Sequence, residues 1–420
     1  MLFRSEAYFI PSHTSTQVFK SLTNAPEVTF LPRANSVLSS VQFAASQFPV
    51  GESDQAATVM VTRSGDISTP ASVDFITSDG SATQKGDYMF TQGRLNFAAG
   101  QASKTFPVFI VDDALQEGTE SFSVMLSNPI GTTIGAMNVA AVAIAANDAS
   151  PGPNPLDNAN AQFFVRQHYL DFLNREPDAG GLSFWANQIT SCGSDQTCID
   201  IRRINVSAAF YLSIEFQETG YLVYKMYKAG YGNLTVPAGA PVAIRYQEFL
   251  PDTQQVSNGV VIGQPGAQQK LEDNKVAYTN DFVTRTRFAT AYPTTRTPAQ
   301  FVDALIANAA FTPTPAERTS FISEFGTATT TVDTAARARV VRRIAENGTF
   351  STQETNKAFV LMQYFGYLRR NPYDPPEAGL DYGGYNFWLG KLNQFNGNFV
   401  NAEMVKAFIL SGEYRQRFGP

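Results

Sequence analysis

The chain has 420 residues, enough for two or three domains that each bury a hydrophobic core. Its formal net charge is -6, and a nucleic-acid partner is not expected because phosphate binding needs a basic surface. No apolar run is long enough to span a bilayer, so no transmembrane segment is expected.

The first 35 residues carry little structural signal, and residues 1–35 are left unassigned. The start, Met1 to Ser5, lacks the basic stretch, apolar run and cleavage site of a signal peptide. We expect the natural start to lie further upstream, together with an export signal.

Residues 36–149 are predicted to form an antiparallel β-sandwich. Short segments alternate apolar and polar side chains, and Gly, Asp and Ser turns separate them. The predicted strands are 58–63, 71–76, 94–97, 104–111, 121–126 and 140–145.

Acidic side chains crowd the end of the strand that finishes near Val111. Asp112 and Asp113 follow it directly, and Glu117 and Glu120 come next. Carboxylates at this density repel one another unless a cation lies among them, and hard oxygen ligands suit Ca²⁺. A solvated acidic turn without a cation is the alternative.

Ordered motifs across this segment carry a family resemblance: Val50-Gly-Glu52, Arg63-Ser-Gly65, Gly86-Asp-Tyr88, Leu95-Asn-Phe97, Val111-Asp-Asp113, Glu120-Ser-Phe122 and Asn147-Asp148. The segment resembles the Calx-beta domain, the calcium-binding sandwich of sodium–calcium exchangers and of many bacterial surface proteins. In that family calcium binds at one end of the sandwich. The resemblance implies the ligands Glu52, Asp87, Asp112, Asp113, Glu117 and Asp148.

The closing acidic run of the family is reduced here to Asn147-Asp148, which implies one or two calcium ions rather than a larger cluster. Asp79 and Glu120 also match family positions. We interpret Asp79 as part of a turn and Glu120 as part of a strand.

Three further parts follow the sandwich. The proline-rich segment 150–159 is predicted to be an extended linker. The apolar period then becomes helical, and residues 160–236 are predicted to be a first helical unit with Asn160 as its N-cap. Residues 237–350 are predicted to connect it to a second helical unit, 351–420.

The connecting region is predicted to be loop-rich from Pro237 to Gly266 and helical after that. Helix starts are predicted at Thr297, Thr314 and Ser351, because Gln or Glu stands three residues after each.

The two helical units share ordered motifs. The segment 178–185, with its Gly pair and Trp185, recurs as 381–388 with Trp388, and 209–216 recurs as 407–414. Upstream, Phe164, Tyr169 and Arg175 correspond to Phe359, Tyr364 and Arg370. The unit resembles domain-of-unknown-function family 4214, a helical module of bacterial extracellular proteins, and that family implies no catalytic residue.

Few side chains suggest other chemistry. His13 and His168 are the only histidines. His168 and Asp171 are either a helical metal pair or, as we expect, satisfied helix side chains, because a zinc site needs three or four protein ligands. Asp178 and Asp381 are expected to cap turns or helices rather than to react.

Aromatic and sulfur side chains allow two more predictions. Trp185 and Trp388, with Phe184 and Phe387 beside them, are expected to anchor the core, and a sugar-stacking face is the alternative. Cys192 and Cys198 would form a disulfide in an oxidising compartment.

The sequence as a whole favours a non-enzymatic, calcium-binding protein that is secreted or attached to a bacterial surface. The sandwich would be an adhesive or spacer module, and the helical units would contact a cell-surface, matrix or protein partner. The alternative is a secreted, carbohydrate-active enzyme whose carboxylates lie in the helical region.

Overall fold

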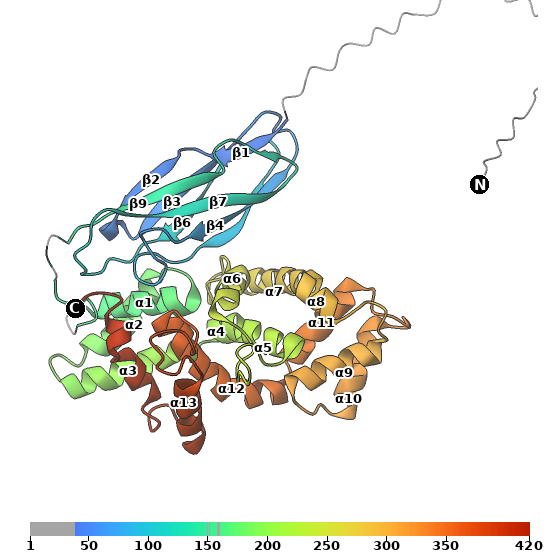
Figure 1. Cartoon of the computed structure of the whole chain (residues 1–420). Helices are drawn as coiled ribbons and strands as arrows, with labels where there is room; N and C mark the ends of the chain where they lie inside the picture. Colours follow the sequence, from blue (N-terminus) through green and yellow to red (C-terminus); the bar gives the residue numbers. More distant parts are fainter. Residues whose placement is uncertain (1–37, 149, 151, 158–159) are drawn as a thin grey trace, which may run out of the picture. The chain divides into compact units, whose positions relative to one another are not determined.

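The computed structural model describes residues 38–148, 150, 152–157 and 160–420. The predictions for residues 1–35, for His13 and for positions 149, 151, 158 and 159 lie outside the described residues. The described chain has two parts, a β-sandwich followed by a mostly helical region, as the sequence predicts (Figure 1).

Two sheets make up the sandwich. In the described residues the strands are β1 (Ser40–Phe43), β2 (Gln47–Gly51), β3 (Ala56–Ser64), β4 (Ala71–Ser78), β5 (Gln92–Phe97), β6 (Ser103–Phe109), β7 (Glu120–Ile130), β8 (Thr133–Ile134) and β9 (Val139–Ala145). One sheet has the order β6-β3-β1-β8 and the other β2-β9-β7-β4-β5. The chain changes sheets between β1 and β2, and this places β1 parallel to β8 and β2 parallel to β9, two exceptions to the antiparallel prediction.

The sandwich core follows from the alternation along each strand. On β3, Ala57, Val59 and Val61 point inward and are buried, whereas the residues between them are more exposed. Aromatic rings join the two sheets: Phe75 stacks on Phe106 with ring centroids 3.7 Å apart.

The helical region begins at residue 161. Its helices are α1 (Ala161–Leu173), α2 (Ala179–Thr190), α3 (Gln196–Leu212), α4 (Ile214–Glu218), α5 (Gly220–Tyr231), α6 (Tyr246–Ser257), α7 (Ala267–Thr284), α8 (Thr286–Ala291), α9 (Pro298–Ala309), α10 (Pro315–Ile322), α11 (Thr334–Ala345), α12 (Gly348–Gln363), α13 (Gly383–Gln394), α14 (Met404–Ile409) and α15 (Gly412–Arg415). The structure also has the 3-10 helices η1 (Glu52–Asp54) and η2 (Ser323–Phe325) and the π-helix η3 (Tyr364–Leu368). Among the described helices, none combines the length and the apolar character that a membrane crossing requires.

Helix α6 lies inside the segment Pro237 to Gly266, which is predicted to be loop-rich. Tyr246, Phe249, Leu250 and Val256 recur at helical spacing and are buried. Pro251 hides this pattern in the sequence because proline normally ends a helix. Here the helix continues past it.

Most predicted helix starts are confirmed. Asn160, Thr297 and Thr314 are N-caps whose side chains accept a backbone N–H three residues on. The predicted start at Ser351 is wrong, because α12 begins earlier and Asn347 caps it. The hydroxyl of Ser351 instead accepts a hydrogen bond from the Lys225 ammonium at 2.9 Å.

The repeated motif makes the same ion pair in both helical units. Arg175 donates two hydrogen bonds to Glu215, at 2.6 and 2.8 Å. Arg370 donates two to Glu413, at 2.7 and 3.0 Å. Each pair ties the residue after the first helix of its unit to the L-S-x-E segment near its end, which supports the interpretation as two copies of one unit.

The Gly pair of the motif has a steric reason. A Cβ atom on Gly181 would overlap the hydroxyl of Tyr169, and one on Gly384 would overlap the hydroxyl of Tyr364. Only glycine lets the start of the second helix approach the tyrosine so closely. The tyrosine and the glycine of the motif are therefore packing partners.

The predicted structural roles of the two motif aspartates are confirmed. Asp178 is the N-cap of α2 and accepts from the Gly181 N–H at 2.9 Å. Asp381 accepts from the Gly383 N–H at 2.7 Å, as in an Asx turn. Glu377, in the longer turn of the second unit, accepts from the Gly384 N–H at 3.1 Å and replaces the cap.

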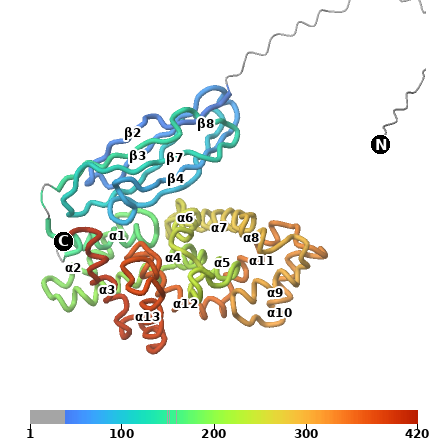
Figure 2. The backbone as a smooth tube through the Cα atoms, in the orientation of Figure 1, coloured from blue at the N-terminus to red at the C-terminus, as the bar shows by residue number. Residues whose placement is uncertain are grey.

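The two units pack against each other although they are far apart in sequence. Helix α14 of the second contacts α3 of the first, and η3 of the second contacts α1. Figures 1 and 2 show the red C-terminal segments next to α1, α2 and α3. Tyr211 stacks on Phe359 at a centroid distance of 4.3 Å. The disulfide expected between Cys192 and Cys198 is present and closes the turn between α2 and α3.

The sandwich also contacts the helical region, and Leu38–Pro420 form one unit. Gln92 of β5 donates from its side chain to the Pro251 carbonyl at 2.9 Å. The Ala114 N–H donates to the Phe418 carbonyl at 3.0 Å. The second contact places the acidic loop after β6 against the last residues of the chain.

Candidate calcium site

Four loops at one end of the sandwich bring carboxylates together. Glu52 lies in η1 after β2, Asp87 precedes β5, Asp113 follows β6, and Asp148 follows β9. In the second sheet β2 and β9 are parallel neighbours, which places the ends that carry Glu52 and Asp148 side by side, while Asp113 follows β6 of the first sheet. Residues 96 positions apart in the chain therefore share one site.

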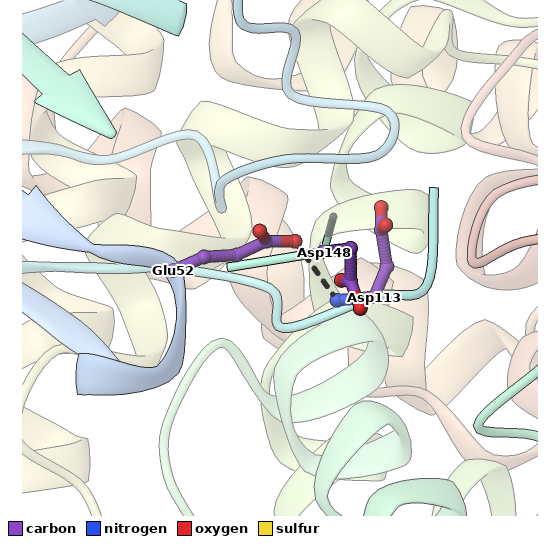
Figure 3. A group of neighbouring side chains, drawn as sticks. All are labelled: Glu52, Asp113 and Asp148. Atoms are coloured by element: carbon purple, nitrogen blue, oxygen red, sulfur yellow. Dashed lines mark hydrogen bonds between the residues drawn. The ribbon is translucent and has the colours of Figure 1, made fainter. Parts of the chain in front are cut away.

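The carboxylates form two overlapping groups. Carboxylate oxygens of Glu52, Asp113 and Asp148 lie within 4.8 Å of one another (Figure 3), and so do those of Asp87, Asp113 and Glu117. Asp113 belongs to both groups and is their centre. Glu52 is fixed by the Asp113 N–H, which donates to its Oε1 at 3.1 Å.

Burial and mutual repulsion raise the pKa values of Asp113 and Glu52. Burial first, and then the charges of Glu52, Glu117 and Asp87, raise the pKa of Asp113 to about 8. Burial also raises the pKa of Glu52, against hydrogen bonds from the Asp113 and Asn147 backbone. The free site is thus electrostatically unfavourable when fully ionised, and a cation would relieve it.

The residues fit a calcium ion. Every candidate ligand atom is a carboxylate oxygen, the ligand type that Ca²⁺ prefers. Asp148 Oδ2 is buried and has no hydrogen-bond partner among the residues that the structure describes. The cavity between Glu52, Asp87 and Glu117 has a volume of about 10 Å³, room for one small ion or one water.

Comparison with known proteins identifies this part of the chain. Residues 36–148 match the Calx-beta domain family. They are a Calx-beta domain. Residues 156–219 match the domain of unknown function DUF4214, and the helical region continues beyond that match.

The relatives match through the Calx-beta domain. Sodium/calcium exchanger 1 of Mus musculus is 44% identical over 72 residues, which are 17% of this chain and 7% of the exchanger. Sodium/calcium exchanger 3 of Rattus norvegicus is 45% identical over 69 residues, again 7% of its length. The chain thus spans a small part of the exchangers that it matches.

Solved structures give a similar result. The apo-form Calx CBD1 domain is 33% identical and is matched over 99% of its length, which covers 26% of this chain with a TM-score of 0.26. The calcium binding domain CBD12 of CALX1.1 is 34% identical and is matched over 46% of its length, with a TM-score of 0.25.

The structure brings together five of the six predicted ligands of the Calx-beta domain and sets Asp112 apart. Asp112 belongs to neither carboxylate group, and its Oδ1 accepts from the Asn147 side-chain amide at 2.8 Å. It holds the loop after β9 that carries Asp148. Its predicted role as a ligand remains a prediction.

Glu120 contributes more than the strand structure predicted for it. It begins β7 as expected, but it also lines the cavity of the site. Burial, followed by the charges of Asp87 and Glu117, raises its pKa to about 7. Two sequence signals pointed to it, its place three residues after Glu117 and its match to a family position. Asp79 lies in a turn, as predicted, and accepts from the Tyr88 hydroxyl at 2.6 Å.

The other candidate residues have structural contacts. His168 is buried, with its ring nitrogens hydrogen-bonded to the Phe164 carbonyl at 2.7 Å and the Ser207 hydroxyl at 3.0 Å. Burial lowers its pKa to about 4, so it is a neutral core residue. Asp171, its predicted partner in a metal pair, binds Arg417 instead.

The tryptophans are core anchors, but their neighbours are not. Trp185 and Trp388 are partly buried and pack on the helical core. Phe184 and Phe387 are 56% and 57% exposed, which corrects the prediction that they are buried with the tryptophans. Adjacent helix positions are about 100° apart, so both rings of a Phe-Trp pair rarely enter one core.

Proposed function

We propose that the protein is a non-enzymatic, calcium-binding protein of the cell exterior. The observation that carries this proposal is the set of carboxylates around Asp113, with the partnerless oxygen of Asp148 beside them. Glu52, Asp87, Asp113, Glu117 and Asp148 would hold one ion or two. A site with so short a closing acidic run should bind with a Kd of about 10⁻⁴–10⁻³ M, the range of extracellular modules.

Bound calcium would make the connection between the sandwich and the helical region more rigid. The loop that carries Asp113 also contacts the helical region, through Ala114 and Phe418. On the other side of the site, Arg166 of α1 donates to the carbonyls of Gln55 and Ile110 at 3.2 and 3.1 Å. Neutralising the carboxylates would fix these loops and stiffen the joint between sandwich and helices.

An exterior location is supported by the disulfide between Cys192 and Cys198, since such bonds persist in oxidising compartments. In this proposal the sandwich is a spacer or adhesive module and the helical units contact a cell-surface, matrix or protein partner. The exposed rings of Phe184 and Phe387 give each unit one apolar position for that contact. The alternative of a carbohydrate-active enzyme finds no support in the contacts of His168, Asp178 or Asp381.

The proposal is tested by melting the full chain at increasing calcium concentration. Bound calcium stabilises only the native state, and at 100 times Kd the gain is about 2.7 kcal/mol. Asp113→Asn, and Asp112→Asn with Asp113→Asn, should abolish the rise in melting temperature. Asp66→Asn removes an acid outside the cluster and should leave it intact. A calcium response unchanged in the double variant would place the site elsewhere.

A further inference from the structure

A second cavity lies between the sandwich and α6. Its volume is about 360 Å³, a size typical of small-molecule sites. Phe90 and Leu250 give it apolar walls. Its polar and charged walls come from Asp79, Gln84, Lys85, Tyr246, Gln247 and Arg369. The side chain of Gln254 hydrogen-bonds the Phe90 carbonyl, so the two walls are joined beside the cavity.

The side chain of Arg369 is buried in this wall and makes no hydrogen bond to the described residues. Its side chain is 1% exposed, and its three guanidinium nitrogens have no hydrogen-bond partner among the described residues. The carboxylate of Asp171 lies 3.6 Å away but already accepts two hydrogen bonds from Arg417, at 3.0 and 3.1 Å. Two guanidinium groups thus share one carboxylate, which leaves one positive charge unbalanced in a buried place.

The backbone does not explain an arginine at this position. Arg369 has a φ of 53°, a left-handed conformation that favours Gly and Asn. The corresponding residue of the first helical unit is Asn174, which has a φ of 55° and ends its helix in the same way. The second unit therefore carries an arginine in a strained conformation, without a side-chain hydrogen bond to the described residues, where the first carries the favoured residue.

Two other polar atoms at this cavity are also without partners. The Tyr246 hydroxyl and Gln84 Oε1 are buried and make no hydrogen bond to the described residues. The Tyr246 ring lies 5.4 Å from the Arg369 guanidinium, so the two can act on one ligand group. Three unsatisfied groups around one cavity are unusual, because buried polar atoms are nearly always paired.

We propose that this cavity binds a small organic acid. Its carboxylate would accept two hydrogen bonds from Arg369, the two-point geometry that guanidinium groups favour, and one from the Tyr246 hydroxyl. Its apolar body would lie between Phe90 and Leu250. Asp79 and Lys85 line the same cavity and carry opposite charges, and Lys85 already pairs with Glu413 at 3.8 Å. Arg369 is then the cation that a single carboxylate would meet.

The test is calorimetric titration of the full chain with phenylacetate as probe. We expect a Kd on the order of 1 mM or tighter, and binding at least about tenfold weaker for phenylacetamide, which has the same shape and no charge. Arg369→Gln and Tyr246→Phe should each weaken the binding of phenylacetate. Arg94→Gln, which removes a surface arginine paired with Asp74, should not.

Folding of the variants is checked by thermal melting without ligand. Arg369→Gln removes an unbalanced buried charge and should melt no lower than the wild type, and Tyr246→Phe keeps the ring. Equal binding of acid and amide, or unchanged binding to Arg369→Gln, would overturn the proposal. Binding of inorganic phosphate without phenylacetate would overturn the assignment to organic acids.

Discussion

Two regions of this protein bury charged side chains and balance them in opposite ways. At the end of the Calx-beta domain, Glu52, Asp87 and Asp113 face one another, and no lysine or arginine of the described chain forms an ion pair with them. In the helical units, Glu215 and Glu413 each face an arginine. The pairs are complete without a ligand, whereas the cluster needs a cation or protons.

This difference distinguishes residues that stabilise the fold from residues that are grouped to bind a ligand. Residues of the repeated helical motif satisfy one another, so their recurrence reflects the construction of the unit. The carboxylates of the sandwich raise one another's pKa values, so their grouping disfavours the free protein and is explained by a ligand. Three predictions test this contrast.

The largest effect is expected from breaking an ion pair of the helical motif. Arg175→Met leaves Glu215, whose side chain is 6% exposed, buried without its partner. We expect the free energy of unfolding to fall by about 3–5 kcal/mol, measured by urea denaturation. Arg318→Met breaks an exposed pair with Asp303 and should change little. Equal losses of unfolding free energy in the two variants would contradict the distinction between the buried motif pair and an exposed pair.

A pH series distinguishes the cluster from the pairs. Because the folded pKa of Asp113 is about 8, above its usual value of 3.8, the native state without calcium holds a proton that the unfolded state releases. Without calcium this contribution to stability is fully present below about pH 4 and is lost as the pH rises through about 8.

Calcium binding must displace this proton, so its apparent affinity should fall on the order of tenfold per unit as the pH drops below about 8. Titrations at about pH 6, 7 and 8 measure the slope. Asp113→Asn should flatten it. A calcium affinity that is constant over this range would show that Asp113 does not titrate with the site.

The smallest expected effect concerns Glu120 and Asp112, two acids at the edge of the carboxylate cluster. Glu120→Gln should weaken calcium binding about three- to tenfold, because Glu120 lines the cavity. Asp112→Asn should weaken it less, because Asp112 acts through its hydrogen bond to Asn147. Calorimetric titration of the two variants compares them directly, and the reverse order would restore Asp112 as a ligand.

The sequence by itself determined the local elements and most of the candidate site. Alternation along 58–63 and 121–126 is a property of neighbouring residues, and β3 and β7 form there. The caps at Thr297 and Thr314 depend on residues three apart. Family motifs located Glu52, Asp113 and the other carboxylates because each sits at a fixed place relative to a strand end.

Only the tertiary structure decided which of these residues meet. Helix α6 continues through Pro251 because the buried face around it outweighs one lost hydrogen bond. Asp112 and Asp113 are adjacent in sequence, yet only Asp113 joins the carboxylate groups, whereas Asp112 accepts a hydrogen bond from the Asn147 amide. The Arg369 side chain makes no hydrogen bond to the described residues because Arg417, 48 residues later, occupies the carboxylate of Asp171 that both approach. Such outcomes depend on distances between segments that no local pattern encodes.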